Sequence, residues 1–366
     1  MRLVNRRWSV AGGVGAALTT TAAAAAAVAS RRSKADPLDG ESLGDLTADR
    51  YSTVASDDGT PLSVAEIDPS AGEEPGLTVV GVHGFALSKR SWHFQRGALA
   101  ECAHPPVRQV YYDHRGHGNS GAATAEESTI TTLAADLAAV LRSLVPTGPI
   151  VLLGHSLGGM VVMELARQCP EYFDGDRVRG VGLLATAAGQ LSSSGAARGM
   201  LSRYNPLTRG VGGLAHWQPS LVEFVRAASG GLTRQAVRSL AFGSRDVSPR
   251  LVDFMLEMLA VTPVGELANF VETLSSHDRY DALAGFGDTR VLVAGGDTDR
   301  ITPFHHAETI ADACGNGTLL RVRGAGHMAH LEQPELVNSH IVELLRCCAS
   351  ATNGEHSVGR TRWWRR

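Results

Sequence analysis

A serine between glycines is the first candidate for chemistry in this chain of 366 residues. Ser156 lies in the sequence GHSLGG at positions 154–159, directly after the apolar run 150–153 and before a helical pattern that starts at Met160. A strand-to-helix turn of this kind exposes the hydroxyl of its central serine, and flanking glycines avoid a collision with the neighbouring strand or helix. The pattern therefore predicts that Ser156 is a nucleophile.

A serine nucleophile needs a base that takes its proton and an acid that orients the base. Asp299 follows the apolar run 291–294, and His327 follows the small-residue loop 324–326. Because the carboxyl ends of parallel strands meet at one edge of a sheet, loops far apart in the chain can converge there. We predict a catalytic triad of Ser156, Asp299 and His327, with His327 as the base.

Neighbouring residues could replace two members of this triad. Asp297 is the alternative acid, since it follows the same apolar run, but the turn after Gly296 favours Asp299. His330 is the alternative base, but His327 is the histidine that directly follows the small-residue turn. We expect His330 to be structural or to face the helical cap predicted below.

Acyl transfer also needs backbone N–H groups that stabilise the negative oxygen of the transition state. Each such donor contributes about 3 kcal/mol. Leu157 begins the helix after the serine, where the helix dipole favours negative charge. Phe85 follows His83 and Gly84 at the end of the apolar run 77–82. We predict that the N–H groups of Phe85 and Leu157 form the oxyanion hole.

The elements that must position these residues alternate between strands and helices. Continuous apolar runs, typical of strands buried on both faces, occur at 77–82, 107–112, 150–153, 178–185 and 291–294. Helical patterns lie between them, at 130–144 and 160–168, and a turn signal at 56–60 separates two runs, 50–55 and 61–67, that predict a hairpin. The sequence predicts an α/β fold with a mostly parallel sheet and helices on both faces.

A long interval interrupts this alternation between the predicted sixth and seventh strands. A single crossover needs roughly a dozen residues, far fewer than the stretch 187–288 contains. Helical spacing within it predicts a helical cap at 192–275, inserted into a core made of residues 36–191 and 276–348.

Taken together, the spaced motifs resemble those of the α/β-hydrolase superfamily, over residues 50–346. The resemblance rests on the serine turn, the acid turn 296–303, the histidine loop 324–327, the oxyanion loop 83–85 and the D-x-R-G-x-G-x-S loop 113–120. Within this superfamily, the chain most resembles actinobacterial hydrolases that carry a cap between strands six and seven. Those hydrolases are similar to esterases, monoacylglycerol lipases and cofactor-free haloperoxidases. It implies hydrolysis of small or medium carboxylic esters through an acyl-enzyme.

Other reactions remain open with the same residues. Perhydrolysis, thioester cleavage and C–C bond hydrolysis use the same serine machinery. A non-catalytic receptor, with the cap enclosing a small apolar ligand, is the alternative from another class.

The composition limits the partners. A net charge of −3 gives no electrostatic field that would attract nucleic acid. The expected partner is the small ester substrate that the resemblance implies, and no protein partner is inferred. The pairs His327 with His330 and His114 with His117 lack a third ligand at a familiar spacing, so we expect neither metal nor organic cofactor. The five cysteines show no paired C-x-x-C spacing and are expected to be reduced thiols.

Both ends of the chain differ from this core. Residues 8–30 carry no charge and are flanked by arginines, so segment 1–35 is interpreted as a signal or signal anchor that would make the chain membrane-associated or exported. Their richness in alanine, glycine and threonine leaves a disordered tail on a cytoplasmic protein as the alternative. Residues 349–366 form a basic tail with two tryptophans, interpreted as solvated.

Overall fold

The computed structural model describes residues 36–45, 47–69, 73–175, 177–191, 231–315 and 317–350. The predicted signal segment 1–35, the first part of the predicted cap (192–230) and most of the basic tail (351–366) lie outside these residues. The chain divides into a first unit, Met1–Glu41, whose described part is a short turn, and a second unit, Ser42–Arg366, which contains all the elements below.

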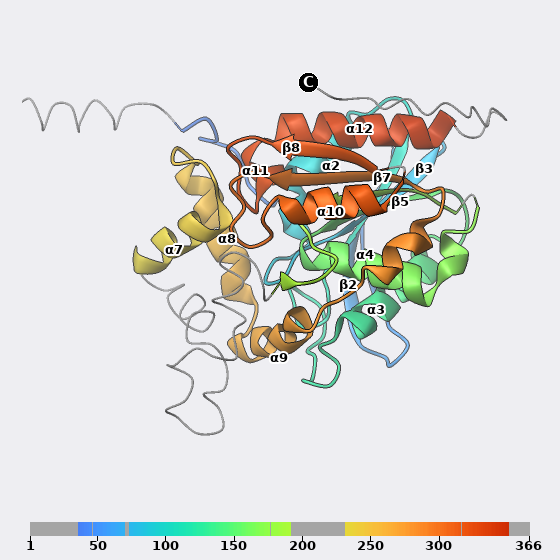
Figure 1. The fold of residues 1–366 in the computed structure, drawn as a ribbon, viewed down its shortest axis with the longest axis horizontal. Helices are drawn as coiled ribbons and strands as arrows, with labels where there is room; N and C mark the ends of the chain where they lie inside the picture. Colours follow the sequence, from blue (N-terminus) through green and yellow to red (C-terminus); the bar gives the residue numbers. More distant parts are fainter. Residues whose placement is uncertain are drawn as a thin grey trace, which may run out of the picture. The chain divides into compact units, whose positions relative to one another are not determined.

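An eight-stranded sheet forms the centre of the second unit (Figure 1). Its spatial order is β1-β2-β4-β3-β5-β6-β7-β8. The predicted hairpin is confirmed: β1 pairs with β2 in antiparallel orientation, and β2 pairs with β4 in the same way. All later pairs are parallel. The strands are β1 (Arg50–Ala55), β2 (Pro61–Ile67), β3 (Leu77–Val82), β4 (Val107–Tyr112), β5 (Ile150–His155), β6 (Val178–Leu184), β7 (Arg290–Gly296) and β8 (Gly317–Val322).

Helices cover both faces of this sheet, as predicted. Figure 1 shows α12 above β7 and β8, with α10 below them. Alternate residues of one strand enter different cores: Val80 packs with α3 and α4, whereas Val79 packs with α2 and α12. The helices of the two layers are η1 (Lys89–Trp92), α2 (His93–Ala100), α3 (Ile130–Leu144), α4 (Leu157–Gln168), η2 (Pro170–Tyr172), η6 (Asp281–Phe286), α10 (His305–Ala313), α11 (Ala329–Glu332) and α12 (Pro334–Ser350). No helix in the described ranges is long and apolar enough to cross a bilayer.

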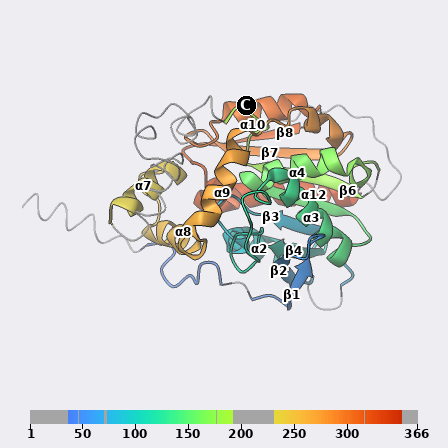
Figure 2. The ribbon, with the colours of Figure 1, turned by 90° about the horizontal axis from the view of Figure 1, so that it is seen from below.

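Between β6 and β7, the interval in which the sequence predicts a cap, the described residues 231–275 form three further helices. They are α7 (Gly231–Ala241), α8 (Pro249–Val261) and α9 (Val264–Ser275), and Figure 2 shows α7 and α8 at one side of the sheet. We refer to the described residues 231–275 as the insertion. The cap boundaries at 192 and 275 stay a prediction.

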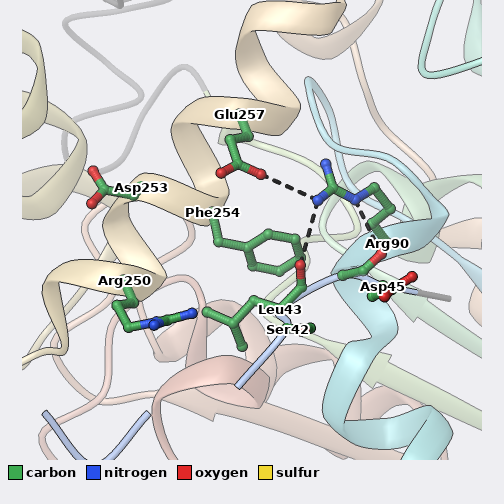
Figure 3. Close-up of a pocket in the computed structure, with 9 residues that line it drawn as sticks. Ser42, Leu43, Asp45, Arg90, Arg250, Asp253, Phe254 and Glu257 are labelled. Atoms are coloured by element: carbon green, nitrogen blue, oxygen red, sulfur yellow. Dashed lines mark hydrogen bonds and ion pairs between the residues drawn. The ribbon is translucent and has the colours of Figure 1, made fainter. Parts of the chain in front are cut away.

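Arg90 connects the insertion to the core. Its guanidinium lies 5.3 Å from the centre of the Phe254 ring of α8, pairs with Glu257 at 3.1 Å, and donates to main-chain carbonyls in the segment 42–45 (Figure 3). These groups surround a cavity of about 660 Å³. Its lining includes none of the predicted triad or oxyanion residues.

The loop after β4 is held by a buried arginine. Arg115 donates to both carboxylate oxygens of Asp136 on α3, at 2.6 and 2.7 Å, and to Asp58 in the β1–β2 turn at 2.7 Å. The side chains of Arg115 and Asp136 are each 1% exposed. Because removing one partner of a buried pair leaves an uncompensated charge, this network should be important for stability.

We expect Asp136→Asn to lower the free energy of unfolding by about 3 kcal/mol, because Arg115 then loses its buried charged partner. Urea unfolding followed by circular dichroism measures this. The control is Asp57→Asn, whose partner Arg142 is half exposed, and its effect should stay below about 1 kcal/mol. Equal losses in the two variants would contradict the assignment.

Candidate active site

Ser156 lies in a sharp turn between β5 and α4. Its φ of 53° and ψ of −117° lie in a region that non-glycine residues rarely adopt, so surrounding contacts must hold this backbone. A Cβ on Gly158 would overlap the carbonyl oxygen of Val82, and one on Gly154 would lie 2.7 Å from the nitrogen of Gly159. The predicted steric need for glycine at positions 154 and 158 is therefore confirmed.

Three loops bring the predicted triad residues together. Ser156 follows β5, Asp299 follows β7 and His327 follows β8. The Nε2 atom of His327 lies 2.9 Å from the Oγ atom of Ser156, and its Nδ1 atom lies 2.9 Å from the Oδ2 atom of Asp299. Ser156 is 9% exposed, and the other two residues are 6% exposed each. Asp299 is 143 positions after Ser156, and His327 is another 28 positions further on. The three side chains nevertheless form one continuous line of hydrogen bonds.

The carboxylate of Asp299 fixes the direction of this line. Its Oδ1 atom accepts the N–H groups of Ile301 and Thr302 at 2.8 and 2.9 Å, and its Oδ2 atom accepts the Thr302 hydroxyl at 2.8 Å. An ionised carboxylate only accepts hydrogen bonds, so the proton of a neutral His327 belongs on Nδ1. The lone pair of Nε2 then faces the serine hydroxyl.

The loop after β3 passes beside the serine. A Cβ built on Gly84 would lie 3.2 Å from the Cβ of Ser156 and 2.6 Å from Nδ1 of His155. Phe85 directly follows Gly84, and Leu157 is the first residue of α4. Both residues predicted to donate to an oxyanion therefore stand in segments that adjoin Ser156.

A sequence model of the Alpha/beta hydrolase family matches residues 79–340. This chain belongs to that family. The match covers the loops that carry all three triad candidates, and the order of the sheet strands agrees with the fold that the sequence motifs predicted.

One relative of this alpha/beta hydrolase matches about three quarters of the chain. The dihydrolipoyllysine-residue acetyltransferase component of the acetoin cleaving system from Pseudomonas putida is 28% identical over 278 residues, which are 75% of this chain and 65% of that protein. The chain thus spans slightly less than two thirds of that relative's length.

Solved structures share the fold. An esterase from Exiguobacterium antarcticum superposes with a TM-score of 0.62 at 19% identity, covering 81% of this chain and 100% of its own. A bromoperoxidase from Bacillus anthracis gives a TM-score of 0.60 at 22% identity, again covering 81% and 100%. At these identities the likeness shows the fold alone.

Buried histidines surround His327. His155 donates from Nε2 to the carbonyl oxygen of His327 at 3.1 Å, and the ring of His330 lies 4.4 Å from the ring of His155. Burial lowers the pKa of His155 well below its ordinary value and the pKa of His330 to about 3. Both imidazoles are therefore neutral near pH 7, and His155 is hydrogen-bonded to the main chain of His327.

Asp297 and the histidine pair of the loop after β4 lie outside the triad. Asp297 accepts the N–H of Gly324 at 2.7 Å and so ties the acid turn to the loop that follows β8. The rings of His114 and His117 are 6.1 Å apart, and burial lowers the pKa of both. Among the described residues, no group of three or more histidine, cysteine, aspartate or glutamate side chains is arranged to hold a metal ion.

Thr302 is a site residue that the sequence reasoning missed. Its hydroxyl donates to Asp299 and lies 3.3 Å from Nδ1 of His327, and the residue is 4% exposed. The available signal was its position three residues after the acid, where a threonine can close a turn onto a carboxylate.

We expect Thr302→Val to reduce kcat/KM about tenfold, because Asp299 loses a donor and a hydrogen bond to a charged group is worth about 1.5 kcal/mol. Steady-state hydrolysis of a small aryl ester measures this. Thr309→Val is the matched control, since that hydroxyl donates only along α10 to the carbonyl of His305 and the residue is exposed. Unchanged kinetics in Thr302→Val would contradict a role for this hydroxyl.

Proposed function

We propose that this chain is a serine hydrolase that cleaves carboxylic esters through an acyl-enzyme. The observation that carries the proposal is the pair of 2.9 Å contacts made by His327, one to Ser156 and one to Asp299. In this mechanism the Oγ of Ser156 attacks the acyl carbon while Nε2 of His327 takes its proton. The imidazolium formed is stabilised by the carboxylate of Asp299.

The second half of the cycle uses the same groups. His327 returns the proton to the leaving alcohol, which departs and leaves the acyl group on Ser156. Water then enters, and His327 takes a proton from it as the water oxygen attacks the acyl carbon. When the bond between that carbon and the Oγ of Ser156 breaks, His327 returns the proton to Oγ, which releases the carboxylic acid and restores the serine. These steps balance with water as the co-substrate.

Stabilisation of the negative oxygen is assigned to two backbone N–H groups. Leu157 is the first residue of α4, so its N–H belongs to the four that have no partner within the helix, and the helix dipole adds positive potential there. Phe85 is the second proposed donor. The closeness of Gly84, the residue before it, to Ser156 supports this assignment. Two such donors would contribute about 6 kcal/mol to transition-state stabilisation.

The choice of ester hydrolysis over related reactions is also a proposal. Similarity in fold to an esterase supports it, whereas similarity to a bromoperoxidase supports perhydrolysis as the second candidate. The two differ in whether water or hydrogen peroxide attacks the same acyl-enzyme. A series of aryl esters with increasing acyl chain, assayed with and without peroxide, separates them.

We expect a fluorophosphonate probe to label the wild-type chain and to leave Ser156→Ala unlabelled. Ester hydrolysis should fall by about 10³-fold or more in that variant, since the nucleophile is lost. Ser339→Ala, which changes an exposed serine on α12, should retain both properties. Equal labelling of Ser156→Ala and wild type would refute the assigned nucleophile.

We also propose that residues 8–30 direct the chain to a membrane or across it. Fractionation of cells that express the full chain should recover it in membrane or exported material. A chain that lacks residues 1–35 is the matched control and should remain in the cytosol. Recovery of the full chain in the cytosol would refute this proposal.

A further inference from the structure

The carboxylate of Glu332 binds two segments that are far apart in the sequence. At the end of α11, it accepts the N–H of Gly326 at 2.6 Å. It also accepts the N–H groups of Gly243 and Ser244, at 2.9 and 3.0 Å, from the loop that follows α7 in the insertion. Gly326 directly precedes His327, so one side chain connects the base loop to the insertion.

Close packing of main chain accompanies these bonds. A Cβ on Gly326 would lie 2.6 Å from the nitrogen of Gly243, and a Cβ on Gly243 would overlap the hydroxyl of Thr298 in the acid turn. The N–H of Met328 donates to the carbonyl of Ala241 at 3.0 Å. The end of α7 and the loop after it therefore contact two segments: the acid turn, which carries Asp299, and the loop that carries His327.

A further hydrogen bond links the acid turn to helix α7 itself. Arg300, the residue after Asp299, donates to the carbonyl oxygen of Ser239 in α7 at 2.7 Å. The end of α7 is thus bonded to the residue beside the acid and to the residue beside the base.

The charge of Glu332 suits this arrangement. Three N–H groups converge on its two oxygens, and an ionised carboxylate can accept all of them. Burial raises the pKa of Glu332, with Asp299 acting in the same direction, while the N–H groups of Ser244, Gly326 and Gly243 lower it. A glutamine amide would turn an NH₂ group toward at least one of these donors.

We propose that Glu332 is a positioning residue that fixes His327 by binding its loop to the loop that follows α7. The position of the insertion on the core and the position of His327 are then coupled through the carboxylate of Glu332. The inference rests on the proposed function of His327. Its consequence is kinetic: a misplacement of about 1 Å at the base can cost up to about a hundredfold in rate.

The test compares Glu332→Gln with wild type and with Glu343→Gln, which changes an exposed carboxylate on α12. For each protein we would measure kcat and KM on a small aryl ester, the rate of phosphonylation of Ser156 by a small fluorophosphonate, and the Tm. A positioning role predicts that kcat and the phosphonylation rate of Glu332→Gln fall together by about tenfold or more, with a smaller change in KM. Glu343→Gln should match wild type.

A purely structural role predicts a different result. Glu332→Gln would then have a lower Tm but, well below that temperature, a wild-type kcat and phosphonylation rate, and this outcome overturns the inference while leaving the proposed function intact. If wild type itself is not phosphonylated, the proposed function and the inference both fall. Should Glu332→Gln not fold, Glu332→Asp keeps the charge but shortens its reach, and the same joint fall supports the inference whereas unchanged rates refute it.

Discussion

The close approach of the start of α4 to the end of β3 is the constraint on which the site depends. Because a Cβ on Gly158 would overlap the Val82 carbonyl, the first turn of α4 can lie directly against the strand. This contact holds Ser156 in its strained conformation and brings the serine beside the segment of Phe85. A larger residue at position 158 would displace the helix start, and with it Ser156, away from His327 and from the segment of Phe85.

Much of the fold was predictable because most strands are buried on both faces. β3 and β5 are buried at every position, and continuous apolar runs identify such strands directly. β8 was not recognised from a run of this kind. It lies at the edge of the sheet, four of its six residues are not buried, and Leu319 is 38% exposed, so its sequence GTLLRV does not indicate a buried strand. The insertion was predicted from the length of the interval, but length alone does not set its boundaries.

The convergence of the three proposed triad residues was predictable for a different reason than the contacts of the residues around them. Chain order, and loops at the ends of strands, bring Ser156, Asp299 and His327 to one edge in any sheet of this topology. Thr302 contacts Asp299 through its hydroxyl, and Glu332 accepts backbone N–H groups. Residue spacing does not specify which groups such side chains will reach. The contact between Glu332 and residues 243–244 depends on how the insertion folds back, which only the three-dimensional structure provides.

Neutral histidines around the base have an electrostatic consequence for the proposed cycle. His327 takes up a positive charge when it accepts the serine proton, and a second imidazolium beside it would oppose that step. His155, whose ring centre is 5.1 Å away, stays neutral because burial lowers its pKa, and the His327 charge lowers that pKa further. His155 can therefore donate a hydrogen bond to the main chain of the base without repelling the imidazolium. Asp299, in direct contact with Nδ1, supplies the compensating negative charge in the proposed cycle and fixes the tautomer that this cycle requires.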